Sequence, residues 1–361
     1  MVDPRVKELA ELLVGRSIEV QPGWQVMVQA TALARPFVEE LVRAIARRGA
    51  YPLVRLSFTD LERVPFETVW ALEAPEALLE QPAPLDVRTR NEIDARVIVF
   101  SAENVFATSE LPTERRLALR RAARAAIDPA VEQEMPWVSC PFPTQGLAQE
   151  AGVSLRTYAD ILFAACLRDW DAEGERMKRY AERFDAAEQV RIAGRETDLT
   201  LSVAERRADI DDAHLNMPGG ELFLCPVEDS AEGFITFNEY SATYLGRRFE
   251  GIRLQFEAGL VVDASASRGA DDLISVLDTD DGARRLGELG IGCNRGIPRD
   301  VQHMWWDEKI DGTIHLALGQ SFAHLGGLNE SAIHWDIVKD LSRGRIELDG
   351  ETVQQDGEWL I

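Results

Sequence analysis

The 361-residue sequence lacks several features that would assign it to a common class of protein. It has only four cysteines, which are far apart and form no Cys-x-x-Cys pair, so neither a disulfide framework nor a structural zinc site is expected. No apolar run approaches the roughly 18 residues that a membrane-spanning helix needs. The charged N-terminus also differs from a signal peptide. These absences predict a cytoplasmic protein with reduced thiols and no membrane partner.

The motifs of three common enzyme classes are missing as well. The sequence contains no Gly-x-Ser-x-Gly nucleophile elbow, no phosphate-binding P-loop and no His-Glu-x-x-His zinc motif. The glycines at 219 and 220 lack the strand-to-helix context of a dinucleotide-binding fingerprint. Any catalytic site must therefore be sought in less regular patterns.

Basic residues are few relative to acidic ones. The chain has 39 Lys and Arg against 62 Asp and Glu, which gives a formal net charge of -23. Such a charge repels nucleic acids and anionic membranes, so neither is expected as a partner. It favours cations, including divalent metals and the ammonium group of a peptide N-terminus. Surface solubility alone would also explain it.

The hydrophobic patterns predict an α/β protein of two domains. In residues 1–189, short apolar strands alternate with amphipathic helices, which predicts a parallel sheet with flanking helices. In residues 190–361, alternating apolar and polar residues are separated by Gly and Asp turns, which predicts a mainly antiparallel α+β domain. Within it we expect a helix over about 273–290 and a hairpin turn at Asp349-Gly350.

All five histidines lie in the C-terminal domain, and two of them occupy predicted strands. In 313–319, alternation places His315 on the face opposite Ile314, Leu316 and Leu318. In 332–337, His334 and Asp336 are two residues apart, so their side chains leave the same face of the strand. An imidazole and a carboxylate so placed can bind one divalent cation. Ordinary structural hydrogen bonding is the alternative at each histidine.

Two glutamates stand in unusual surroundings. Glu221 follows a Pro-Gly-Gly loop, and Glu288 is flanked by glycines and apolar residues. A buried carboxylate there would need a counter-charge or a metal. A surface position for Glu221 and a helix-end position for Glu288 remain open alternatives.

Three segments carry a resemblance to a known family: Gly282-Ala-Arg-Arg-Leu-Gly-Glu-Leu, Asp307-Glu-Lys-Ile-Asp-Gly-Thr-Ile-His-Leu-Ala-Leu-Gly, and Gly326-Gly-Leu-Asn-Glu-Ser-Ala-Ile-His-Trp-Asp. With these motifs the sequence resembles the aminopeptidase T and aminopeptidase S family of two-metal metallopeptidases. The likeness extends over nearly the whole chain, including the Pro-Gly-Gly-Glu segment that ends at Glu221.

The resemblance implies two divalent metal ions (Zn, Co or Mg) held by two glutamates, two histidines, an aspartate and a tyrosine. Five of these ligands fall on Glu221, Glu288, His315, His334 and Asp336. The tyrosine position is Phe322, which has no oxygen to offer, and His324 is a candidate replacement.

The activity that the resemblance implies is that of a metal-dependent aminopeptidase, which releases N-terminal residues from peptides with metal-activated water. Glu221 and Glu288 would act at the metals, and either could bridge them. Glu330 is a candidate general base or N-terminus anchor, with an exposed loop position as the alternative. The resemblance also implies a homodimer.

Two other functions fit the same ligand types. Ring-cleaving dihydroxypyridine dioxygenases are similar in fold and hold a single Fe(II) with two histidines and an aspartate. The second alternative is a degenerate relative that keeps the fold but has no catalytic activity. The presence of both glutamates favours the two-metal peptidase.

Overall fold

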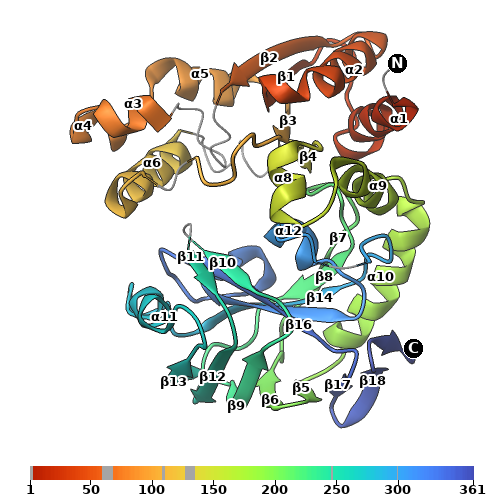
Figure 1. Cartoon of the computed structure of the whole chain (residues 1–361). Helices are drawn as coiled ribbons and strands as arrows, with labels where there is room; N and C mark the ends of the chain where they lie inside the picture. Colours follow the sequence, from red (N-terminus) through yellow and green to blue (C-terminus); the bar gives the residue numbers. More distant parts are fainter. Residues whose placement is uncertain (1–2, 59–67, 108–109, 127–134, 245–246, 299) are drawn as a thin grey trace. The chain divides into compact units, whose positions relative to one another are not determined.

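The chain folds into two compact units (Figure 1). The computed structural model describes residues 3–58, 68–107, 110–126, 135–244, 247–298 and 300–361. The first unit combines Met1–Leu167 with Ala213–Pro218, and the second combines Arg168–Asp212 with Gly219–Ile361. We predicted a boundary between residues 189 and 190. The units divide earlier, because helix α10 (Trp170–Asp185) buries Met177, Tyr180 and Phe184 in the core of the second unit.

The first unit contains a four-stranded parallel sheet of order β2-β1-β3-β4. Its strands are β1 (Gln25–Thr31), β2 (Tyr51–Ser57), β3 (Ala95–Phe100) and β4 (Trp137–Pro141). Its helices are α1 (Pro4–Leu12), the π-helical turn η1 (Leu13–Ser17), the 3-10 turn η2 (Ala32–Ala34), α2 (Arg35–Arg47), α3 (Thr68–Glu73), α4 (Glu76–Leu79), α5 (Pro84–Glu92), α6 (Thr113–Ala125), α8 (Gln145–Glu150) and α9 (Leu155–Cys166). The predicted parallel sheet with flanking helices is confirmed.

Local sequence explains where several of these helices begin. The side chain of Asp3 accepts a hydrogen bond from the backbone N–H of Arg5, and Pro4 occupies the first position of α1. Thr144 and Ser154 cap α8 and α9 in the same way. Each cap satisfies a backbone donor that the first turn of a helix leaves free.

The second unit contains two larger sheets whose pairings are antiparallel. The eight-stranded sheet contains, in spatial order, β13 (Leu260–Ser265), β12 (Ile252–Glu257), β9 (Glu232–Phe237), β6 (Thr197–Ser202), β5 (Gln189–Gly194), β17 (Gly344–Leu348), β18 (Glu351–Gln355) and β19 (Glu358–Trp359). The five-stranded sheet contains β16 (His334–Asp340), β15 (Thr313–Gly319), β14 (Leu286–Gly292), β8 (Glu221–Leu224) and β7 (Asp209–Asp211).

Smaller elements complete the second unit. Strands β10 (Ala242–Tyr244) and β11 (Arg247–Phe249) form a two-stranded ribbon. Besides α10, the helical segments are α11 (Ala270–Leu277), α12 (Met304–Asp307) and the 3-10 turn η3 (Ala323–Leu325). The predicted mixed α/β fold, with antiparallel sheets after the parallel one, is confirmed.

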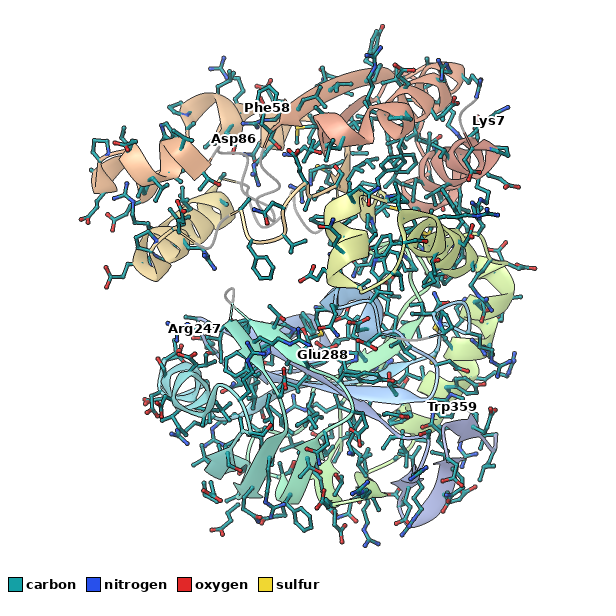
Figure 2. The ribbon with its side chains drawn as sticks, in the orientation of Figure 1. Lys7, Phe58, Asp86, Arg247, Glu288 and Trp359 are labelled. Carbon is teal, nitrogen blue, oxygen red and sulfur yellow. The ribbon has the colours of Figure 1, made fainter. Side chains whose placement is uncertain are left out.

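One hydrophobic core joins both large sheets. Ile192 and Leu199 enter it from the eight-stranded sheet, whereas Leu289, Leu316 and Ile337 enter it from the five-stranded sheet. Because side chains alternate along a strand, the residues between these core positions face away from the core. Glu288 is one of them and lies among the strands of this unit (Figure 2).

The prediction of a helix over 273–290 is wrong for its second half. Helix α11 ends at Leu277, and strand β14 begins at Leu286. A β-bulge between Leu286 and Glu288 lets Leu286 and Leu289 both enter the core. Glycines at 287, 290 and 292 also disfavour a helix here. Glu288 therefore belongs to a buried strand and not to a helix end.

The predicted hairpin at Asp349-Gly350 is confirmed. Leu348 of β17 pairs with Glu351 of β18, and both turn residues have positive φ, 49° and 86°. This is the combination that a two-residue turn of type I′ requires.

No helix in the described part of the chain is both long enough and apolar enough to cross a lipid bilayer.

Trp335 provides a test of the core of the second unit. Its ring is buried and lies 5.2 Å from the ring of Tyr244 and 4.7 Å from that of Phe249, measured between centroids. Trp335→Ala should lower the free energy of unfolding by about 3–5 kcal/mol through cavity formation. Trp335→Phe should cost less than Trp335→Ala, since it leaves a smaller cavity and the indole N–H has no hydrogen-bond partner among the described residues. Urea unfolding of both variants measures this. Equal losses would contradict the packing described.

Candidate metal centre

The five predicted ligands lie on one face of the five-stranded sheet. They come from four neighbouring strands, β8, β14, β15 and β16. The register pairs Gly292 with Glu221, Ala317 with both Glu288 and Asp336, and Gly319 with His334. Because the residues between them enter the core, all five side chains point to the opposite face.

Small residues leave room for the imidazoles and carboxylates on this face. Gly290 pairs directly with His315, and a Cβ added at position 290 would lie 2.0 Å from the Nε2 and Cε1 atoms of that ring. Only glycine at 290 is therefore compatible with the observed position of His315.

Two groups of side chains on this face could each hold a metal ion. The first comprises Glu221, Glu308 and His315, and the second comprises Glu288, His334 and Asp336. Within each group, the potential ligand atoms lie within 4.8 Å of one another. Nitrogen and carboxylate donors in threes are a typical set for Zn²⁺ and related divalent ions in catalytic sites.

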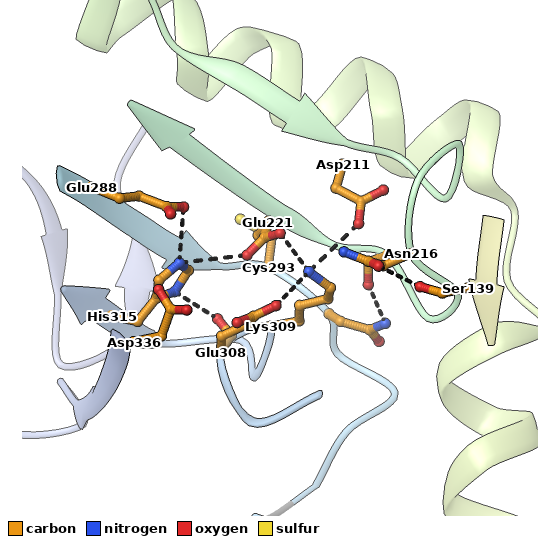
Figure 3. Close-up of polar contacts among 12 residues, drawn as sticks. Ser139, Asp211, Asn216, Glu221, Glu288, Cys293, Glu308, Lys309, His315 and Asp336 are labelled. Carbon is orange, nitrogen blue, oxygen red and sulfur yellow. Dashed lines mark hydrogen bonds and ion pairs between the residues drawn. The ribbon is translucent and has the colours of Figure 1, made fainter. Parts of the chain in front are cut away.

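Glu288, a member of the second group, also contacts the first. Its Oε1 is 3.2 Å from Nε2 of His315, and its Oε2 is 3.2 Å from Nε2 of His334. Nε2 of His315 also lies 3.6 Å from Oε2 of Glu221 (Figure 3). Nε2 of His334 lies 3.6 Å from Oδ2 of Asp336. Each oxygen of Glu288 thus faces a different group, as in a carboxylate that bridges two ions.

The histidines are held by their other ring nitrogens. Nδ1 of His315 lies 3.1 Å from the backbone carbonyl oxygen of Glu308, and Nδ1 of His334 lies 2.8 Å from that of Gln320. A carbonyl oxygen can only accept, so both Nδ1 atoms donate, and Nε2 faces the carboxylates. Metal-binding histidines are commonly oriented by this kind of contact.

The pKa values in the metal-free chain reflect the crowding of charge. Burial opposes charging of His315 and His334, but the neighbouring carboxylates Glu288 and Asp336 prevail and raise the pKa of each imidazole to about 10. Burial also works to raise the pKa of Glu288, but hydrogen bonds from both imidazoles lower it to about 2. Burial raises the pKa of Glu221 and of Asp336.

Two buried carboxylate oxygens indicate that metal ions, and not protons alone, neutralise the charge of this centre. Oε2 of Glu221 and Oδ1 of Asp336 have no hydrogen-bond partner among the described residues. An unsatisfied buried carboxylate oxygen is costly unless a cation approaches it. Since one such oxygen lies in each group, the donor set fits two divalent ions.

Three residues of this centre were not predicted from the sequence: Asp211, Glu308 and Lys309. Lys309 is fully buried, and its Nζ lies 3.0 Å from Oε1 of Glu308, 3.5 Å from Oδ2 of Asp211, and within hydrogen-bond distance of Oε1 of Glu221. Burial opposes its charge, but the three carboxylates hold its pKa well above the usual range. The Asp307-Glu-Lys segment carries part of the family resemblance, but residues outside a strand show no alternation from which the direction of their side chains can be predicted.

The remaining predicted residues lie at the margin of the centre or outside it. The ring of Phe322 is 5.3 Å from that of His334 and 5.7 Å from that of Phe223, so an apolar wall borders the second group. His324 is 59% exposed and lies 3.9 Å from Asp209, and it belongs to neither group. Glu330 is exposed in the loop before β16.

Comparisons with known proteins match this chain over nearly its full length. Aminopeptidase T of Thermus thermophilus is 28% identical, with 98% of this chain and 95% of that protein covered. Aminopeptidase 2 of Geobacillus stearothermophilus is 24% identical, with 99% and 98% covered.

Two solved structures share the fold. Wild-type AmpT from Thermus thermophilus has a TM-score of 0.85 at 24% identity, with 99% of each chain covered. The 2,5-dihydroxypyridine dioxygenase from Pseudomonas putida has a TM-score of 0.58 at 14% identity, with 98% of this chain and 96% of that chain covered.

A family model decides the assignment. The model described as thermophilic metalloprotease (M29) matches residues 2–359. The aminopeptidase resemblance predicted from the sequence is thereby confirmed, and this chain belongs to the thermophilic metalloprotease (M29) family.

Proposed function

We propose that this protein is a two-metal aminopeptidase that removes N-terminal residues from peptides. Membership of a metalloprotease family implies use of divalent metal. The observation that carries the proposal is the placement of Glu288, with one oxygen toward each of two groups of metal-binding side chains. Glu221, Glu308 and His315 would hold one ion, and His334 and Asp336 would hold the other together with Glu288.

The residues of the centre have distinct roles in this mechanism. Two divalent ions held by these residues would lower the pKa of water toward about 7 and polarise the scissile carbonyl. Glu288 would offer one oxygen to each group, since its two oxygens face different imidazoles. The carbonyls of Glu308 and Gln320 keep both Nδ1 atoms protonated, so that each Nε2 offers a lone pair.

Glu330 remains our candidate general base or anchor for the substrate ammonium group. It is exposed, and it lies four residues before His334 in the chain. Its carboxylate is thus free to meet a substrate, which suits either role.

The ions we propose are Zn, Co or Mg. Their donors are carboxylate oxygens and imidazole nitrogens, with no thiolate among them. The four cysteines are all buried and none of them forms a disulfide, which supports a reducing, cytoplasmic location. A homodimer is the proposed assembly, as expected from the resemblance.

The single-iron dioxygenase is less well supported. The structural likeness to the dioxygenase concerns the fold alone. A single iron held by two histidines and an aspartate would leave Glu221 and Glu308 without a role, although both are buried and grouped with His315. The relatives in sequence reported above are named aminopeptidases.

Metal removal tests the proposal directly. After treatment with a strong chelator and dialysis, hydrolysis of leucyl p-nitroanilide should fall by about 100-fold or more, because water at its ordinary pKa is a poor nucleophile. Addition of Zn²⁺, Co²⁺ or Mg²⁺ should restore it, while protein dialysed without chelator keeps its activity. Full activity of protein shown by elemental analysis to be metal-free would refute the mechanism. Absence of activity with every metal would favour the degenerate relative.

Two separate histidine variants distinguish a metal ligand from a histidine outside both groups. His334→Ala should lower the metal content from two ions per chain to one and reduce hydrolysis by at least about 100-fold. His324→Ala is the matched control, since this histidine lies nearby but in neither group. Elemental analysis and leucyl hydrolysis measure both variants. Equal metal contents in the two variants would exclude His334 as a ligand.

The pH dependence of stability should differ between the metal-free and metal-loaded forms. In the metal-free chain the pKa of His315 and of His334 is raised from 6.5 to about 10. Their stabilising contribution is therefore full below pH 6.5 and is lost as the pH rises through about 10. We expect Tm of the metal-free protein to fall over this range and Tm of the loaded protein to fall less. An equal fall of Tm with pH in the two forms would contradict the proposal that metal ions take the place of the protons on these histidines.

A further inference from the structure

Lys309 is an unusual neighbour for a metal centre. It is a fully buried cation inserted among three buried carboxylates, Asp211, Glu221 and Glu308, as Figure 3 shows. Two of these carboxylates also belong to the first metal-binding group. The ammonium group therefore occupies a place where a positive charge competes with a metal ion for the same oxygens.

The contact also orients Glu221. Its Oε1 accepts a hydrogen bond from Lys309, whereas its Oε2 points to Nε2 of His315 at 3.6 Å. Oε2 of Glu221 thus faces the first metal-binding group, while Oε1 is engaged by the ammonium group. Glu308 is shared in the same manner, since its Oε1 lies 3.0 Å from the ammonium nitrogen.

The second group lacks such a neighbour. Among the residues that the structure describes, neither Glu288 nor Asp336 forms an ion pair with a lysine or an arginine. With neutral imidazoles, Glu288 and Asp336 present two negative charges to an ion. Glu221 and Glu308 also carry two, but the ammonium group of Lys309 lies against one oxygen of each, whereas Asp211, which shares that positive charge, is farther from it at 3.5 Å and belongs to neither metal group.

From this asymmetry we propose that Lys309 is a positioning residue that makes the two metal sites unequal. The ion at Glu288, His334 and Asp336 binds tightly, and the ion at Glu221, Glu308 and His315 binds weakly and exchanges. The inference rests on the proposed two-metal function and adds an order of occupation to it. In a buried centre, one unit charge a few ångströms from a divalent ion changes its affinity by at least about tenfold.

Calorimetric titration of the metal-free protein with Zn²⁺ tests this order. The parent chain should bind two ions in two separate steps. Lys309→Met keeps the apolar volume and removes the charge, so the weaker step should tighten by at least about tenfold. The gap between the two dissociation constants should narrow accordingly.

Lys339→Met is the matched control. Lys339 is also buried, but its Nζ donates to the carbonyl oxygen of Thr236 at 2.7 Å and lies 3.4 Å from Glu239. Its substitution removes a buried ammonium group of the same unit without touching either metal group. Both binding steps should stay as in the parent.

Asp211→Asn should have the opposite effect. Asp211 lies 3.5 Å from the ammonium nitrogen but belongs to neither group. Removing its charge leaves Lys309 less neutralised, so the weaker step should loosen by at least about tenfold. If Lys309→Met does not fold, Asp211→Asn tests the proposal by itself. An unchanged dissociation constant for the weaker step in Asp211→Asn overturns the proposed role of Lys309.

The outcomes distinguish the proposed role of Lys309 from the proposed two-metal function. Two equal steps in the parent, or no tightening in a folded Lys309→Met, would overturn the inference and leave the two-metal function intact. Tightening of the same step in Lys339→Met would overturn it as well, because the effect would then be unspecific. Fewer than two ions in the parent would refute the two-metal function itself, and the order of occupation with it.

Discussion

The accumulation of buried negative charge on one face of a sheet is the constraint on which the second unit depends. Five carboxylates meet there, from Asp211, Glu221, Glu288, Glu308 and Asp336. Such a cluster is unstable unless cations neutralise it. Lys309 supplies one positive charge, and two divalent ions would supply the rest. If the proposed ions bind here, folding and metal binding are coupled in this unit, as in other proteins whose ligands converge only in the folded state.

The period of the β-strand makes this constraint compatible with a hydrophobic core. In β16, His334 and Asp336 face the centre, and Trp335 between them enters the core. In β14, a bulge corrects the alternation so that Glu288 reaches the centre between two core leucines. The same few strands therefore stabilise the unit with one face and hold the ligands with the other.

Sequence patterns predicted the part of the site that lies on regular strands. Alternation placed His315, and His334 with Asp336, on strand faces where the structure finds them. Glu221 and Glu288 were singled out for their surroundings, and only the family resemblance joined them to the histidines. The expected helix over 273–290 missed β14, because Leu-Gly-Glu-Leu-Gly has no clear period.

Other features depend on contacts between distant residues, which no local pattern encodes. Lys309 and Asp211 are far apart in sequence, and the pairing of β7 with β8 places Asp211 opposite Glu221, which Lys309 also contacts. The division of the chain near 167 depends on the packing of α10 against the second unit. Gly290 shows another such dependence: its missing Cβ is the space that the imidazole of His315 fills. The two positions should covary in evolution, so that a side chain appears at 290 only in sequences that have given up the histidine.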